Sequence, residues 1–180
     1  MLKMSLRKIR GSIQVYPENW INVIETNCYA YALGLDIKEN DICKYAYRPG
    51  SISVNRKLFV YKDEKEEMLY LKYLSYDSFV DKLENDLDCL NLEYREVNPS
   101  EPIDSDEWKI AFLTRKDGCR IRDFHFLRQN SDGIWTQKKG YYCGIDSVDC
   151  MGKTVKNPAY GYWQSFEYGK CYVLKKSGKV

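Results

Sequence analysis

The sequence predicts an α+β fold in which N-terminal helices pack on a C-terminal antiparallel β-sheet. Apolar residues recur at helical spacing in the first half of the chain. From about residue 108 they alternate with polar residues in short runs, as in half-buried strands. The 180 residues, 44% hydrophobic and 30% charged, are enough to build one domain around its own core. We therefore expect a single domain over residues 1–180, with an inserted helical and loop region around residues 36–107.

Two short helices are expected near the N-terminus. The spacing of apolar residues favours a first helix over residues 17–24. Thr26 and Asn27 are residue types that cap helices, so a second helix is expected to begin at Cys28 and to end at Gly34.

The inserted region is expected to contain a third helix between loops and short strands. Its apolar residues follow one another at intervals of four, four and three, and they are Phe79, Leu83, Leu87 and Leu90. Asp77 is the expected cap of this amphipathic helix. Short strands are expected at 57–61 and 93–97, and a turn is expected at Pro49 and Gly50.

The second half of the chain contains four runs that are typical of strands. They cover residues 108–115, 120–129, 133–139 and 170–176. Turn-forming residues at 130–133 predict a hairpin between the second and third runs. Alternation along 120–129 is expected to place one set of side chains on one face, namely Ile121, Asp123, His125 and Leu127.

His125 is the only histidine of the chain, and the hairpin is expected to give it a polar neighbour. Pairing across the turn places His125 opposite residue 138, or opposite Gln137 if the register slips by one. An amide side chain there would fix the orientation and the tautomer of the imidazole, as a general base requires. Three acidic residues are weaker candidates for the same role: Asp123, Asp146 and Asp149.

Cys28 is the candidate nucleophile. A thiol in the first turn of a helix is expected to have a lowered pKa, because of the helix dipole and the unpaired N–H groups there. With His125 as base, Cys28 has the partners that acyl transfer from an amide requires, and Asn22 or Asn27 would stabilise the oxyanion. Tyr29 is a candidate for contact with the substrate. The alternative interpretation of Cys28 is a buried structural cysteine.

Two stretches carry a resemblance to a known family: "TNCYAYALG" at 26–34 and "DFHFLRQNSDGIWTQKK" at 123–139. They resemble the papain-like cysteine peptidase superfamily, closest to its NlpC/P60 and CHAP group, and small microbial and viral proteins with an NCYAYAL stretch. The resemblance implies a papain-like fold and a cysteine peptidase, amidase or deamidase. It implies the catalytic residues Cys28, His125 and Gln137. A histidine is common in those proteins at the position of Gln137, where this chain departs from the pattern.

Composition restricts the binding partners and the cellular compartment that we expect for this protein. A net charge of +2 and the lack of a long apolar run favour neither nucleic acid nor a membrane as partner. The seven cysteines form no CxxC pair, so we expect no metal site and no cofactor. The absence of a signal peptide favours the cytoplasm, or delivery by a non-classical route. The expected substrate is a peptide or protein amide, and no oligomeric state is indicated.

A second hypothesis belongs to another functional class. A non-catalytic binding protein on the same fold, such as a phage or effector protein that sequesters a partner or a small ligand, would keep the same core residues. The glutamine at position 137 favours this alternative, because an amide cannot act as a second base.

Overall fold

A computed structural model describes residues 27–35, 47–53, 71, 73–129, 133–139 and 144–177. The expected helix at 17–24 and the expected strand at 57–61 lie outside these residues. So do Asn22 and the turn residues 130–132.

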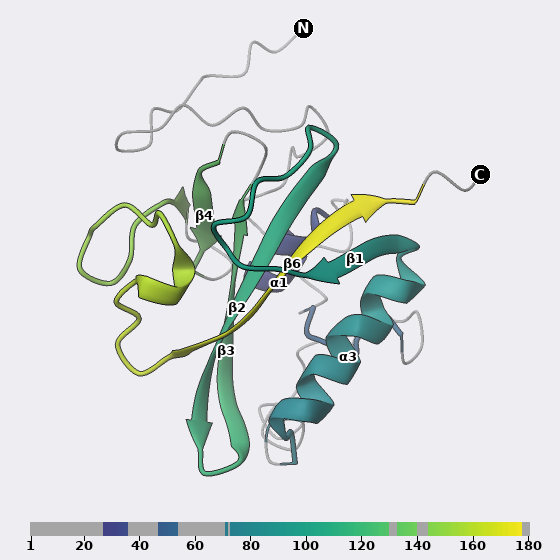
Figure 1. Cartoon of the computed structure of the whole chain (residues 1–180). Helices are drawn as coiled ribbons and strands as arrows, with labels where there is room; N and C mark the ends of the chain where they lie inside the picture. Colours follow the sequence, from purple (N-terminus) through teal and green to yellow (C-terminus); the bar gives the residue numbers. More distant parts are fainter. Residues whose placement is uncertain are drawn as a thin grey trace, which may run out of the picture.

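The described residues form a six-stranded antiparallel sheet (Figure 1). Its strands are β1 (Leu92–Glu96), β2 (Glu107–Asp117), β3 (Arg120–Gln129), β4 (Trp135–Lys138), β5 (Ile145–Asp146) and β6 (Glu167–Lys176). Their order across the sheet is β1-β6-β2-β3-β4-β5, so that β2 lies between β6 and β3. The strands expected from alternation in this part of the chain are confirmed to within a few residues at each end. The two-residue strand β5 was not expected.

Two α-helices and one short 3-10 helix accompany the sheet in the described chain: α1 (Cys28–Leu33), α3 (Tyr76–Cys89) and η3 (Pro158–Tyr160). The expected ends of α1 are confirmed. The Asn27 side chain accepts a hydrogen bond from the Ala30 N–H, and Gly34 ends the helix with a φ of 68°. The cap of α3 is Ser75 and not Asp77, because the Ser75 hydroxyl accepts the Ser78 N–H.

The expected fold class, an α+β papain-like fold with N-terminal helices packed on a C-terminal sheet, is wrong. The described chain is mostly antiparallel sheet. Of its two α-helices, α1 has only six residues and α3 lies in the middle of the sequence, directly before β1. These helices do not form the N-terminal helical layer that the papain-like arrangement requires.

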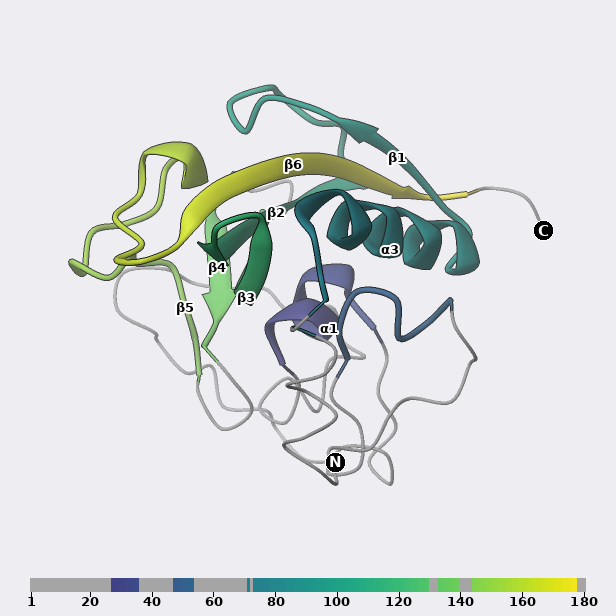
Figure 2. The same ribbon diagram turned by 90° about the horizontal axis from the view of Figure 1, so that it is seen from below.

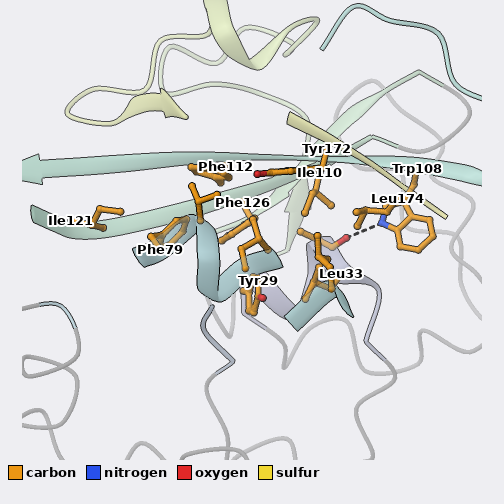
Figure 3. Packing of buried hydrophobic residues seen from close by; sticks show 14 of the residues in the cluster. Tyr29, Leu33, Phe79, Trp108, Ile110, Phe112, Ile121, Phe126, Tyr172 and Leu174 are labelled. Atoms are coloured by element: carbon orange, nitrogen blue, oxygen red, sulfur yellow. Dashed lines mark hydrogen bonds between the residues drawn. The ribbon is translucent and has the colours of Figure 1, made fainter. Parts of the chain in front are cut away.

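The larger hydrophobic cluster lies between the sheet and the two helices, which Figure 2 shows on the same side of the sheet. Figure 3 shows its packing, with Phe79 of α3 and Tyr29 of α1 beside Phe126 of β3. The indole N–H of Trp108 donates to the Ala32 carbonyl, which ties α1 to β2 (Figure 3). Burial of these aromatic rings is the main stabilising contribution on this face.

A buried carboxylate joins three segments on the same side. Asp86 of α3 has no exposed surface and accepts a hydrogen bond from the Tyr29 hydroxyl at 2.8 Å. It also accepts the backbone N–H groups of Gly50, Ile52 and Ser53. The loop at 47–53, where a turn was expected, is therefore held against α3 by one side chain.

A second, smaller cluster lies on the other face of the sheet. Its members are Ala111, Leu113, Leu127, Trp135, Val155, Trp163 and Cys171. Because side chains alternate along a strand, Leu127 points away from α1 and α3 while Phe126 points toward them. Residues 147–166 contribute Val155 and Trp163, so this segment covers the second cluster.

Strand β3 contains one irregularity that alternation did not predict. Arg115 pairs with Asp123, whereas the next residue of β2, Lys116, pairs with Ile121. One extra residue, Arg122, therefore bulges from β3. As a result Ile121 joins the larger cluster, and its expected placement on the face of His125 is wrong.

Candidate active site

His125 and Gln137 are in direct contact. The His125 Nε2 atom lies 2.8 Å from Gln137 Oε1. Neither of the two expected registers is correct, because Gln137 pairs with Leu127. Gln137 is thus the diagonal neighbour of His125 on the adjacent strand, a distance that long side chains span.

The orientation of the Gln137 amide is set by two acceptors. Its Nε2 donates to Asp146 Oδ1 at 2.9 Å and to the Val148 carbonyl. Since both of these oxygens accept, the amide oxygen must be the atom that faces His125. An amide oxygen also only accepts, so His125 Nε2 carries the proton. The lone pair of the neutral ring is then on Nδ1.

The environment of His125 favours this neutral form. Burial lowers the pKa of His125 below its ordinary value of 6.5, and the hydrogen bond that His125 donates to Gln137 opposes that shift. Of the nearby charges, Lys139 lowers the pKa further, while Asp123 and Asp146 raise it. At neutral pH the ring is therefore an uncharged base.

The thiol of Cys28 does not have the lowered pKa that the sequence suggested. Burial raises the pKa of Cys28 to about 11. The backbone N–H of Phe126 is the largest opposing contribution, the charge of Asp123 raises the pKa further, and the N–H groups of Tyr29 and Cys28 lower it. A six-residue helix offers too small a dipole to offset the loss of solvent.

Cys28 of α1 contacts β3 at Phe126, next to His125 in the strand, but the His125 side chain leaves β3 on the other face. Cys28 packs against the larger cluster, and its thiol interacts with the Phe126 N–H. The side chain of His125 leaves the strand on the face of Leu127. Within the described part of the chain, no hydrogen bond joins the Cys28 sulfur to the His125 ring. His125 and the contact of Cys28 with Phe126 thus both lie at the end of the β3–β4 pairing, which begins at Leu127.

The candidate oxyanion and substrate residues have structural partners. Both ends of the Asn27 side-chain amide are engaged, because Oδ1 caps α1 and Nδ2 donates to the Tyr47 carbonyl. Tyr29 is fully buried, and its hydroxyl donates to Asp86. Asn22 lies outside the described residues.

Of the three acidic residues considered as alternatives to Gln137, one belongs to the site. Asp123 forms an ion pair with Arg115 at 3.2 Å. Asp149 accepts backbone N–H groups of its own loop, including that of Met151. Asp146 contacts Gln137 and was missed as a second partner, because the two-residue β5 has too little periodicity to predict its pairing.

The described residues contain no group of three or more His, Cys, Asp or Glu side chains that could hold a metal ion. None of their helices is long and apolar enough to cross a membrane. Comparisons of the chain with known protein families, curated proteins and solved structures gave no match.

Proposed function

We propose that this protein is a cysteine hydrolase that cleaves a peptide or protein amide, with Cys28 as nucleophile and His125 as general base. The observation that carries the proposal is the His125–Gln137 hydrogen bond, in which a fixed amide leaves the imidazole lone pair on Nδ1. The interaction of the Cys28 thiol with the N–H groups of Phe126 and Tyr29 supports it, since such donors stabilise a developing thiolate.

The proposed reaction begins with transfer of the Cys28 proton to His125 Nδ1 as the sulfur attacks the amide carbonyl carbon. The carbon–sulfur bond forms and the carbonyl oxygen becomes an oxyanion. The imidazolium then returns the proton to the amide nitrogen, the carbon–nitrogen bond breaks, and a thioester remains on Cys28. Water, deprotonated by His125, hydrolyses the thioester and releases the acid and the free thiol.

The resting state of this site would have a neutral thiol at Cys28 and a neutral imidazole at His125. Because burial raises the pKa of the Cys28 thiol to about 11 and lowers the pKa of His125 below its ordinary value, proton transfer costs more than about 6 kcal/mol, at 1.36 kcal/mol per pKa unit. A turnover of about 10 s⁻¹ corresponds to a barrier of about 16 kcal/mol. This cost is part of the total barrier, so the proposed reaction transfers the proton during attack and has no preformed ion pair. The Cys28 sulfur contacts β3 on the face of the larger cluster, whereas the His125 ring leaves β3 on the other face. The proposed reaction therefore requires the two groups to come together beside Leu127 when substrate binds.

A peptide acyl electrophile tests the proposal, because it requires both the nucleophile and the base. The wild type should form an adduct whose mass maps to Cys28. His125→Ala should slow its formation by about 10²–10⁴-fold, the usual contribution of a general base. Cys28→Ala should abolish it, and Cys150→Ala, which removes an exposed thiol, is the matched control. Labelling of the exposed cysteines alone, or a rate independent of His125, would refute the hydrolase.

A second candidate function is a non-catalytic binding protein. The observation that favours it is the raised pKa of Cys28 together with the lack of a Cys28–His125 hydrogen bond among the described residues. In that case Cys28 packs in the core, and the electrophile labels it no faster in the wild type than in His125→Ala.

A further inference from the structure

We propose that Asp146 is a positioning residue that acts on His125 through Gln137, so that three neighbouring strands each contribute one side chain to a His125–Gln137–Asp146 chain. The inference rests on the proposed function and extends it by one residue. The chain is continuous, with 2.8 Å from His125 Nε2 to Gln137 Oε1 and 2.9 Å from Gln137 Nε2 to Asp146 Oδ1.

The register of the sheet explains why these side chains meet. Leu127 of β3 pairs with Gln137 of β4, and Gln137 pairs with Asp146 of β5. His125 is two residues from Leu127 and therefore lies on the same face. The three polar groups follow one another across the sheet, each within reach of the next strand.

The two oxygens of Asp146 have different partners. Oδ1 accepts the Gln137 amide and, at 3.3 Å, the Val148 N–H, while Oδ2 forms an ion pair with Lys139 at 3.0 Å. A carboxylate cannot donate a hydrogen bond, so Asp146 admits only the NH₂ end of the Gln137 amide. Together with the Val148 carbonyl, it keeps the amide oxygen on His125 and the imidazole proton on Nε2.

The charge of Asp146 has a second effect. An anion at the far end of the amide favours the imidazolium that forms when His125 accepts the thiol proton. Three charged groups act on the ring, namely Asp123 on β3, Lys139 after β4 and Asp146 on β5. The carboxylates raise the pKa of His125, whereas Lys139 lowers it.

Nuclear magnetic resonance of the imidazole tests the inference directly, because His125 is the only histidine and gives one set of ring signals. The ¹⁵N chemical shifts of Nδ1 and Nε2 report the tautomer, and their pH dependence gives the pKa. The variants are Asp146→Ala, which removes both the acceptor and the charge, and Asp146→Asn, which keeps an acceptor oxygen and removes the charge. Lys139→Ala is the matched control, because it removes the ion-pair partner and leaves Gln137 bound.

We expect the wild type to carry its proton on Nε2. Asp146→Ala should raise the share of the Nδ1–H tautomer and slow Cys28 adduct formation by about 10-fold or more, because a protonated Nδ1 cannot accept the thiol proton. Both Asp146 variants should lower the pKa of His125, and Lys139→Ala should raise it without changing the tautomer. The opposite signs separate an effect on the ring from a general loss of structure, and Asp146→Asn serves if the alanine variant does not fold.

Unchanged tautomer and pKa in both Asp146 variants would overturn the inference, whatever the labelling of Cys28 shows. If the ring signals change as expected while the wild type forms no Cys28 adduct, the proposed hydrolase fails and the positioning of His125 by Asp146 stands.

Discussion

At the scale of single residues, the candidate site depends on the contact between His125 and Gln137 and on the ionisation of Cys28. Alternation on two strands was enough to bring His125 near Gln137, although the pairing is diagonal and not direct. The pKa of Cys28 was not predictable, because it depends on how much solvent Phe126 and its neighbours exclude from the sulfur. The orientation of the Gln137 amide was also out of reach, since it depends on a carbonyl at Val148 that no sequence pattern marks.

The raised pKa of Cys28 predicts the pH dependence of its alkylation. Only the thiolate reacts, so with a pKa of about 11 about one thiol in 10⁴ is ionised at pH 7. The rate of reaction with iodoacetamide should rise about tenfold for each pH unit between 7 and 10. Mass spectrometry of the peptide that contains Cys28 measures this rate, with the exposed Cys150 as a faster internal reference at neutral pH. A rate that levels off below pH 9 would contradict the burial of the thiol.

At the scale of elements, the strands and helices of the described chain were largely predictable, because their periods of 2 and 3.6 residues are visible in the sequence. Ser75 was missed as the cap of α3, since Asp77, two residues later, is an equally common capping type. The bulge at Arg122 was missed because the residue pattern of β3 alone does not show how many residues of β2 pair with it.

Strand β6 depends on a glycine that the sequence does not mark as special. A Cβ atom on Gly169 would lie 2.1 Å from a ring carbon of Phe112. Gly169→Ala should therefore displace a ring of the larger cluster and lower the free energy of unfolding by about 1–3 kcal/mol. Chemical denaturation measures the loss. Gly144→Ala is the matched control, because no atom lies within 4 Å of its Cβ position, and equal stabilities of the two variants would disprove the close approach.

At the scale of the whole molecule, the predicted arrangement of the helices and strands in space was wrong. The sequence places helices before most strands, and this order suggested a papain-like arrangement. The described chain instead places β1, which directly follows α3, at one edge of the sheet beside the last strand, β6. Such pairing between residues far apart in the sequence leaves no local signal, and resemblance in two short stretches did not supply it.

Asp86 is the residue on which the arrangement of distant segments most depends. Asp86→Ala would leave the Tyr29 hydroxyl and three backbone N–H groups without their acceptor. We expect a loss of about 3 kcal/mol or more in the free energy of unfolding. In a chain of this size such a loss corresponds to a fall in Tm of about 10 °C.

Thermal denaturation followed by circular dichroism measures that fall. Asp81→Ala, at an exposed position of the same helix, should leave Tm within about 2 °C of the wild type. A similar Tm for Asp86→Ala and the wild type would show that Asp86 does not hold the three segments together.

The bulge at Arg122 also determines where in β3 the loss of a single residue can be accommodated. Because β3 carries one residue more than β2 requires at that point, loss of the Arg122 codon would leave Asp123 and Ile121 adjacent in a regular ladder. Ile121 would still face the larger cluster, two places from Phe124, and His125 would keep its face. We therefore expect the hairpin to tolerate a one-codon deletion at this position. The same deletion between Phe126 and the turn would place His125 and Gln137 on opposite faces of the sheet.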